Sequence, residues 1–268
     1  MITYFSTFFY RFRKRGGTET AGFTDGQHVY YNTDGISRWF CCRYITAVPI
    51  FRKGKGIMNF SDDASGFVSI GDMIPDELLD MRYYSSYNFV GERIDGYEEP
   101  AAILTREAAE ALKAVSDEAM GKGYRLRIFD AYRPQKAVEQ FMRWAADPDD
   151  VRMKPYFYPA MEKKDIIPLG FVARHSTHTR GSTVDLTLFD MDTQQEIDVG
   201  GKFDFFGERS HFDFEGVSEV QHANRMLLRN LMVKHGFRPI NVEWWHFTLM
   251  NEPWPDTYFT FPVRNRIG

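Results

Sequence analysis

Residues 174–190 read RHSTHTRGSTVDLTLFD, a loop with two histidines that leads directly into a predicted strand. Within this strand, Asp185 stands in an otherwise largely apolar run. An unpaired charge inside a strand is costly, so we expect a cation, an arginine or a metal ion to compensate it. The stretch therefore predicts a strand and a candidate site at the same point of the chain.

The segments around this strand predict an α+β fold. The chain has 268 residues, 43% of them hydrophobic and 26% charged, which suits one main globular domain with a buried core. The patterns indicate helices over 106–120, 134–146 and 218–236, and strands over 124–132, 182–190 and 242–250. Repeated βαβ units and a Gly-rich phosphate loop are missing from the sequence. We expect a single compact domain with a central, mainly antiparallel sheet flanked by helices.

Residues 1–57 differ from the rest of the chain in charge. They hold nine lysines and arginines and three acidic residues, whereas the remainder holds 24 basic and 34 acidic residues. We expect an N-terminal extension, either poorly ordered or the result of a translation start placed too early, and a domain over 58–268. A membrane-surface or partner-binding arm is the alternative. A chain begun at Met58 is expected to keep full activity.

The composition also bears on partners and location. The apolar stretch at residues 1–10 precedes its positive charges, unlike a secretory signal, so a cytoplasmic location is expected. No run of about twenty apolar residues occurs, so no membrane span is predicted. The net charge of -4 gives no reason to expect nucleic acid, and a homo-oligomer is left open. The adjacent Cys41 and Cys42 indicate no disulfide framework.

The histidine-rich loop contains a spaced motif of possible metal ligands. The motif S-x-H-x-x-G-x-x-x-D is formed by Ser176, His178, Gly181 and Asp185. The glycine permits a tight turn, after which the carboxylate can approach the imidazole. His175 would compete with His178 for one coordination position, so we expect it to be solvated or outside the set of ligands.

A second motif supplies a further imidazole and a second carboxylate. Glu243 lies three residues before His246, and two tryptophans separate them. Two imidazoles and one carboxylate would leave an open position on a tetrahedral zinc ion, where a water can be polarised. The same three groups also form the facial triad of iron oxygenases. A structural alternative is that Asp185 pairs with an arginine while both histidines bond to backbone groups.

Several blocks of the chain, taken in order, resemble the VanX-type D-alanyl-D-alanine dipeptidases, which are zinc enzymes. The resemblance runs from about Ile70 to Arg264 through YYSSYNFVG, FDAYRPQKAV, STHTRGSTVDLTL, KFDFFGERSH, VEWWHFTL and EPWPDTYFTFPV. It implies one Zn²⁺ per chain, held by His178, Asp185 and His246. It further implies Glu243 as the catalytic base, Arg133 at the developing oxyanion, and Tyr83, Ser176 and Asp204 near the substrate.

Each of these roles has a physical reason. A carboxylate such as Glu243 can take a proton from the attacking water and pass it to the leaving amine. Arg133 offers a permanent cation with forked donors for an oxygen that gains charge, although a structural ion pair would explain it equally well. Asp204 is a counter-charge for a free ammonium, or else an exposed turn residue. All positions of the motifs are intact.

The expected activity is therefore zinc-dependent hydrolysis of D-Ala-D-Ala or a closely similar dipeptide, a peptidoglycan precursor or turnover product. A metallo-carboxypeptidase or endopeptidase acting on longer cell-wall peptides is the alternative within the same class. An iron oxygenase is a less favoured alternative, because Glu243 would have no obvious role in one. A non-catalytic binding module would leave both Glu243 and Arg133 without a role.

Overall fold

A computed structural model describes residues 9–14, 17–24, 27–29 and 59–265, and the chain divides into two units. The unit Met1–Gly56 contains a three-stranded antiparallel sheet of β1 (Phe9–Lys14), β2 (Gly17–Thr24) and β3 (Gln27–Val29). Cys41, Cys42 and Met58 lie outside the described residues. The prediction that residues 1–57 are a dispensable extension therefore stays a prediction.

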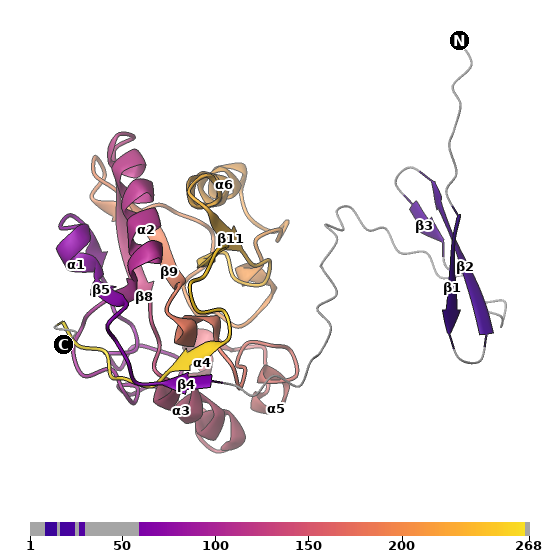
Figure 1. Cartoon of the computed structure of the whole chain (residues 1–268), viewed down its shortest axis with the longest axis horizontal. Coiled ribbons are helices and arrows are strands. Elements are labelled where there is room, and N and C mark those ends of the chain that lie inside the picture. The colour runs from indigo at the N-terminus through magenta and orange to yellow at the C-terminus, as the bar shows by residue number, and fades with distance from the viewer. Residues whose placement is uncertain (1–8, 15–16, 25–26, 30–58, 266–268) are drawn as a thin grey trace, which may run out of the picture. The chain divides into compact units, whose positions relative to one another are not determined.

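The unit Ile57–Gly268 is built on a six-stranded sheet (Figure 1). Its strands are β6 (Leu78–Leu79), β8 (Tyr124–Asp130), β9 (Thr183–Asp190), β10 (Gln195–Glu196), β11 (Phe237–Pro239) and β12 (His246–Leu249). The order is β11-β12-β9-β8-β6, and β10 pairs with β9. Only β6 with β8 is a parallel pair within this sheet. The predicted α+β fold with a mainly antiparallel sheet is confirmed.

Helices surround this sheet. They are α1 (Ile70–Met73), α2 (Arg106–Met120), α3 (Gln135–Ala146), α4 (Lys154–Phe157), α5 (Lys163–Ile166) and α6 (Glu219–Lys234), with 3₁₀ turns η1 (Thr177–Arg180) and η2 (Glu208–Ser210). Helix α2 packs on β8, α6 packs on β11, and the two helices contact each other. Two small pairs complete the unit, β4 (Asn59–Ser61) with β13 (Thr257–Phe259) and β5 (Phe67–Ser69) with β7 (Ile103–Thr105).

Local sequence sets the ends of the long helices. Helix α2 starts where the Thr105 side chain accepts a hydrogen bond from the amide of Ala108. Helix α6 starts with a capping box, in which Ser218 and Gln221 each accept from the other's amide. The predicted helices are present. Pro134 stands at the N-cap of α3, however, one position earlier than the predicted first turn.

The strand predicted over 242–250 is shorter than expected. Only His246–Leu249 are in β12, and the preceding residues form a turn. The amide of Trp244 donates to the carbonyl of Ser210 at 2.9 Å, a bond outside the sheet ladder. This places Glu243 on a turn at the end of the strand rather than inside it. Among the described residues, no helix combines the length and the apolar character that a membrane span requires.

Candidate metal centre

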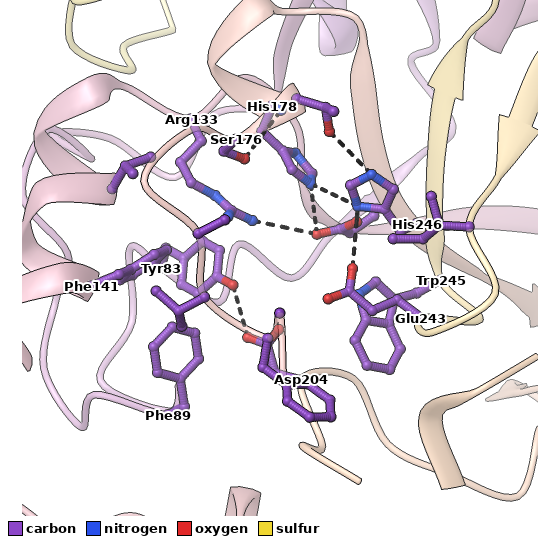
Figure 2. Close-up of a pocket in the computed structure, with 18 of the residues that line it drawn as sticks. Tyr83, Phe89, Arg133, Phe141, Ser176, His178, Asp204, Glu243, Trp245 and His246 are labelled. Atoms are coloured by element: carbon purple, nitrogen blue, oxygen red, sulfur yellow. Dashed lines mark hydrogen bonds and ion pairs between the residues drawn. The ribbon is translucent and has the colours of Figure 1, made fainter. Parts of the chain in front are cut away.

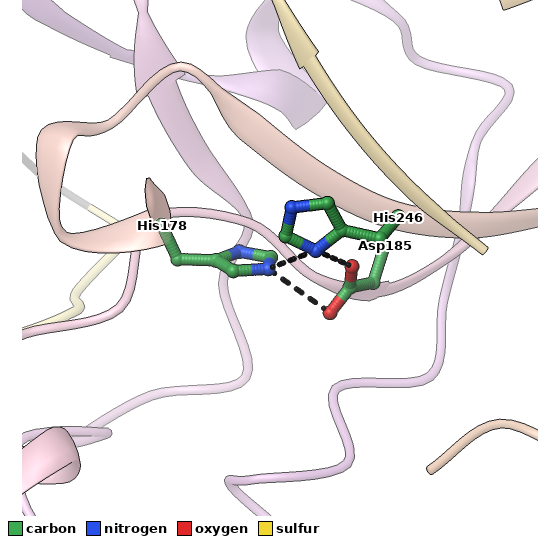
Figure 3. Close-up of side chains that lie close together, drawn as sticks. All are labelled: His178, Asp185 and His246. Atoms are coloured by element: carbon green, nitrogen blue, oxygen red, sulfur yellow. Dashed lines mark hydrogen bonds and ion pairs between the residues drawn. The ribbon is translucent and has the colours of Figure 1, made fainter. Parts of the chain in front are cut away.

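Three side chains from two neighbouring strands and one loop converge beneath the surface (Figure 3). Asp185 of β9 pairs directly with His246 of β12, and His178 comes from η1. Asp185 Oδ2 lies 3.2 Å from His178 Nε2, and Oδ1 lies 3.2 Å from His246 Nδ1. The two ring nitrogens are 3.3 Å apart. The structure thus brings together the three residues that the sequence marks as candidate ligands.

These separations fit a zinc ion. Two ligand atoms on a tetrahedral ion, with bonds of about 2.0–2.1 Å, lie about 3.3–3.4 Å from each other. The two ring nitrogens lie at about this separation, each lies 3.2 Å from a different carboxylate oxygen of Asp185, and all three side chains are buried. The donor set is also one that zinc accepts, two imidazoles and one carboxylate. The residues present therefore fit the metal that the sequence predicts.

Hydrogen bonds orient both imidazoles toward the common point. His178 Nδ1 lies 2.7 Å from the carbonyl oxygen of Ala131, which can only accept, so Nδ1 carries the proton and the Nε2 lone pair faces the centre. His246 Nε2 lies 3.1 Å from Thr177 Oγ1. When Nε2 donates to that hydroxyl, Nδ1 is free to bind a metal. The two histidines are thus arranged to coordinate through different ring nitrogens.

The loop that carries His178 is shaped by its neighbours in the motif. Ser176 is the N-cap of η1, and its hydroxyl accepts from the amide of His178 at 3.3 Å. Gly181 ends η1 with φ of 81°. A Cβ at this position would lie 2.1 Å from the ring of Phe67, so no other residue fits without displacing that ring. Both the positive φ and the close approach require glycine here.

Glu243 lies beside the donor group and has an unusual acidity. Its Oε2 is 3.4 Å from His246 Nδ1. Burial raises the pKa of Glu243 to about 7, with His246 opposing the rise and Asp185 adding to it. A general base works best when its pKa is near the working pH, although a bound cation would favour the carboxylate and lower this value. Glu243 therefore lies where a carboxyl group can exchange a proton with a water bound at the donor group.

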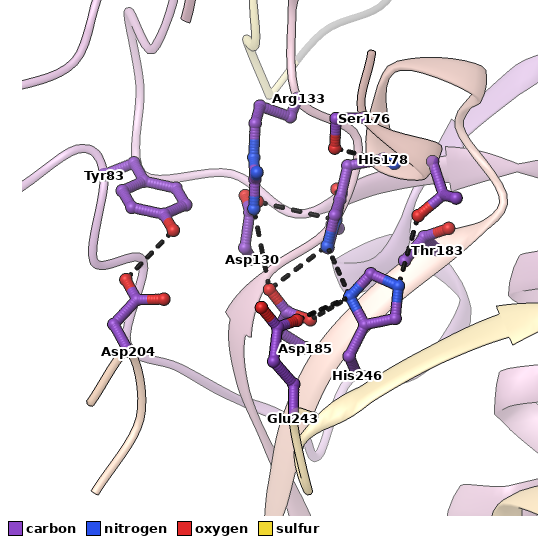
Figure 4. A network of polar contacts seen from close by, with 12 residues as sticks. Tyr83, Asp130, Arg133, Ser176, His178, Thr183, Asp185, Asp204, Glu243 and His246 are labelled. Carbon is purple, nitrogen blue, oxygen red and sulfur yellow. Dashed lines mark hydrogen bonds and ion pairs between the residues drawn. The ribbon is translucent and has the colours of Figure 1, made fainter. Parts of the chain in front are cut away.

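Arg133 reaches the donor group from the loop after β8 (Figure 4). Its Nε and Nη2 each lie 2.9 Å from Asp130 Oδ2, and Nη2 is 3.7 Å from Asp185 Oδ2. Its guanidinium also lies over the ring of Tyr83, 4.9 Å from the centroid. The guanidinium is therefore fixed next to the candidate ligands.

Asp130 is a site residue that the sequence analysis missed. It is fully buried, and its Oδ1 accepts from the hydroxyl of Tyr97 at 2.6 Å. Its Oδ2 is also 3.5 Å from His178 Nδ1. A signal was present, because Asp130 follows Leu126 and Ile128 on the apolar face of β8, just as Asp185 interrupts an apolar strand. The same cost of an unpaired charge would have indicated a partner for it.

Arg180 and Glu252 form a second pair that the sequence did not indicate. Arg180 Nε and Nη2 each donate to one carboxylate oxygen of Glu252 at 2.7 Å. This bidentate pair ties the end of η1 to the turn after β12. It therefore links the two segments that carry His178 and His246.

The opposite end of the site holds Tyr83 and Asp204 (Figure 2). The Tyr83 hydroxyl donates to Asp204 Oδ2 at 2.9 Å. Burial raises the pKa of Asp204 well above its usual range, and the negative charge of Asp185 adds to this effect. Asp204 also has φ of 59°, which is uncommon for a residue other than glycine. The alternative of an exposed turn residue is wrong, because Asp204 is buried.

One cavity of about 200 Å³ connects these groups. Its wall includes the three candidate ligands, Glu243, Arg133, Ser176, Tyr83 and Asp204. His175 also lines the cavity, but it is exposed and is outside the convergent group. The structure therefore gathers all eight predicted site residues around one small space, while their individual roles stay predictions.

A buried group of metal donors, with a carboxylic acid and an arginine beside it, is the arrangement that a metal-dependent hydrolase requires. The chain belongs to the M15 peptidase family of D-Ala-D-Ala dipeptidases, whose family model matches residues 63–264. The family predicted from the sequence is thereby confirmed, and with it a metallopeptidase rather than an iron oxygenase or a binding module.

Curated relatives carry the same description. The D-alanyl-D-alanine dipeptidases of Enterococcus faecalis and Enterococcus faecium are 42% and 40% identical to the chain, each over 74% of this chain and 98% of its own length. That of Streptomyces coelicolor is 38% identical over 74% of this chain and 98% of its length. A solved D,D-pentapeptidase, VanY with Zn(II), has a TM-score of 0.35 at 14% identity, and the match covers 58% of this chain and 77% of that one.

Proposed function

We propose that this protein hydrolyses D-Ala-D-Ala with a zinc ion held by His178, Asp185 and His246. The observation that supports it most directly is the buried convergence of these side chains next to Glu243, with the two ring nitrogens 3.3 Å apart and each 3.2 Å from one carboxylate oxygen of Asp185. The relatives named as D-alanyl-D-alanine dipeptidases supply the substrate class. Zinc bound at this point would lower the pKa of a water toward neutrality and polarise the scissile carbonyl.

Glu243 moves the proton in this proposal. The carboxylate accepts a proton from the attacking water and then gives it to the leaving amine, as amide hydrolysis requires. Its Oε2 lies 3.4 Å from His246 Nδ1, which places the carboxyl group directly beside the point where zinc and its water would bind.

Arg133 stabilises the oxygen that gains negative charge. Asp130 holds its Nε and one terminal nitrogen, and the guanidinium has further N–H donors for a substrate oxygen. Because this cation is already in place, its positive charge stabilises the developing oxyanion, and the site does not have to rearrange. Asp130 acts through Arg133 as a positioning residue.

Tyr83, Asp204 and Ser176 bind the dipeptide. A buried carboxyl group whose pKa is raised lacks a cation, and the free ammonium of a dipeptide would supply one. Tyr83 holds Asp204 in place through its hydroxyl. A volume of about 200 Å³ is below the range of about 300–1,000 Å³ typical of drug-sized ligands, so it favours a small substrate over a longer peptide.

The predictions about the location, the partners and the N-terminal residues of the protein remain proposals. They are a cytoplasmic location, the possibility of a homo-oligomer, the absence of nucleic acid among the partners, and the dispensability of residues 1–57. The location rests on the order of apolar and charged residues at the N-terminus, the absence of nucleic acid on the net charge, and the dispensability of residues 1–57 on their charge and on their position outside the resemblance.

The test compares zinc content and turnover of D-Ala-D-Ala for three variants of the full chain. Glu243→Ala should keep about one zinc per chain while turnover falls about 100- to 10,000-fold. His246→Ala should lose the metal. Arg133→Ala should keep zinc and lose about 100-fold or more, mainly in kcat. A Glu243→Ala protein that holds zinc and turns over at the wild-type rate would rule out the proposed base.

A panel of substrates separates the alternatives. The wild-type protein should prefer D-Ala-D-Ala to L-Ala-L-Ala and to an N-acetylated D-Ala-D-Ala that lacks the ammonium. Faster cleavage of longer peptides that end in D-Ala-D-Ala would instead indicate the carboxypeptidase activity. Metal analysis showing iron and no zinc would contradict the choice of metal.

A further inference from the structure

A second cavity of about 670 Å³ lies behind the wall of the active-site cavity. The two cavities have no lining residue in common. Three segments of the chain contribute to both cavities, and in each segment adjacent residues line different cavities. Arg82 lines the second cavity and Tyr83 the first; Phe203 and Phe205 line the second, while Asp204 between them lines the first. Likewise Trp244 faces the second cavity, and its two neighbours face the first.

The main loop of this cavity is held firmly from behind. The buried side chain of Arg225 in α6 donates to the carbonyls of Val199 at 2.7 Å, Arg209 at 2.8 Å and His211 at 2.6 Å. All three acceptors belong to the loop that surrounds the cavity or to its end. Since the guanidinium bonds to three separate carbonyls, it fixes the loop and leaves the cavity already formed.

The cavity wall carries more cations than acids. Its cations are Arg82, Lys202 and Arg209, and its acids are Glu196 and Asp198. Glu196 pairs with Arg127 at 3.0 Å and Arg82 pairs with Asp80 at 2.8 Å, while Asp198 accepts a hydrogen bond from the neutral amide of Gln221 at 2.9 Å. In the part of the chain that the structure describes, neither Lys202 nor Arg209 pairs with an acid.

Aromatic rings form the rest of the wall. Phe129 and Phe203 stack with their centroids 4.7 Å apart, and the guanidinium of Arg82 lies 5.0 Å from the Phe129 centroid. Trp244 is buried, and its indole N–H finds no acceptor among the described residues. The volume of the second cavity falls within the range of about 300–1,000 Å³ typical of small-molecule sites, which have apolar walls and a few polar groups.

We propose that this second cavity binds a small organic anion, a carboxylate carried on an apolar ring or chain. The rings would contact the apolar body, and Lys202 and Arg209, both of them exposed, would donate charge-assisted hydrogen bonds to the carboxylate. The cavity contains none of the candidate metal ligands, so the proposal goes beyond the proposed function and does not depend on it.

The test uses benzoate and benzamide, which share a shape and differ in charge, and measures their binding to the zinc-loaded full chain by calorimetry at low salt. Benzoate should bind saturably, and benzamide at least about tenfold more weakly. A double variant, Lys202→Met with Arg209→Met, should weaken benzoate binding by at least about tenfold. The matched control removes two exposed cations that line neither cavity, Lys113→Met with Arg143→Met, and should bind benzoate as the wild type does.

Three outcomes would overturn the proposal. The first is the absence of saturable benzoate binding, and the second is binding of benzamide as tight as that of benzoate. The third is unchanged benzoate binding in the double variant of Lys202 and Arg209, because the anion would then bind at the metal or at another surface. The double variant should also keep the wild-type rate on D-Ala-D-Ala, because neither residue lines the active-site cavity. Failure of the proposed hydrolysis would appear in the wild-type assay and would leave the benzoate result intact.

Discussion

Asp185 and Asp204 lie at opposite ends of one small cavity, and both are buried, with 2% and 6% of their surface exposed. The pKa values of the two carboxyl groups nevertheless move in opposite directions. Burial raises the pKa of Asp185, but the imidazoles of His178 and His246 more than offset it, so the pKa lies below its usual range. Burial raises the pKa of Asp204 well above its usual range, and Arg133 and Tyr83 offset only part of the effect.

The difference shows that the partner, and not burial, decides the charge of a buried acid. At the metal end, the acid already has two imidazoles, and a cation would complete the group. At the other end, the acid has a tyrosine hydroxyl and lacks a cation, so it awaits one from the substrate. The contrast predicts that equivalent substitutions at the two ends will have different consequences.

Asp185→Asn should produce the largest effect. The amide is a much poorer zinc ligand than the carboxylate, so zinc content after dialysis should fall to near zero. The loss of affinity should exceed the about 10- to 100-fold typical of residues that only support a ligand. Asp190→Asn, at the end of the same strand, is the matched control and should keep its zinc. Full zinc content in Asp185→Asn would remove it from the ligand set.

Asp204→Asn should keep zinc and instead raise the KM for D-Ala-D-Ala. Loss of a hydrogen-bonded charge pair with the ammonium, worth about 1.5–3 kcal/mol, corresponds to about 10- to 150-fold. The preference over N-acetylated dipeptide should shrink by the same factor. Asp198→Asn, on the same loop but outside the active-site cavity, should leave KM unchanged. An unaltered preference in Asp204→Asn would contradict ammonium recognition.

The pH dependence of stability should also distinguish Asp204. Its pKa in the folded state is raised above an unfolded value near 3.8, so its contribution to stability is fully present below that pH and is lost as pH rises toward the folded value. Asp204→Asn should therefore gain stability relative to the wild type as pH rises, by up to about 1.4 kcal/mol per pH unit. Urea unfolding of the metal-free proteins between about pH 5 and 8 measures this slope.

Asp190→Asn again provides the control for this slope. The pKa of Asp190 is lowered by the amide of Thr193, so this carboxylate is ionised in both states above about pH 5. The difference in unfolding free energy between Asp190→Asn and the wild type should then be flat over the same range. Equal slopes for the two variants would refute the raised pKa of Asp204.

Tyr83→Phe should give the smallest effect. It removes one hydrogen bond to Asp204 and no charge, which corresponds to about 0.5–1.5 kcal/mol, or about 2- to 12-fold in KM. Tyr132→Phe removes a comparable buried bond, to the carbonyl of Phe261, outside the cavity, and should change stability without changing KM. A large fall in kcat for Tyr83→Phe would indicate that the hydroxyl takes part in the chemical step.

Local patterns were enough to predict most of the fold and to mark His178, Asp185, Glu243 and His246 as candidates, whereas Arg133, Tyr83, Ser176 and Asp204 came from the resemblance to the VanX-type dipeptidases. Alternation and caps indicated β8, β9, α2 and α6, and the spacing from Ser176 to Asp185 indicated the ligand loop. The turn at Glu243 was not predicted, because Trp244 bonds to Ser210, which is distant in sequence. Partners such as Ala131 for His178, and Glu252 for Arg180, are likewise set by tertiary packing. The second cavity depends on an irregular loop that has no periodicity to detect.

The direct pairing of Asp185 with His246 makes the metal centre sensitive to strand alignment. Side chains on a strand alternate between faces, so a slip of β12 by one residue would turn His246 to the other side of the sheet and disassemble the donor group. A misaligned but compact chain would thus lack a complete site. Zinc bound per chain after refolding consequently counts the molecules whose β9 and β12 have paired correctly, and the ligand group serves as an internal check on assembly.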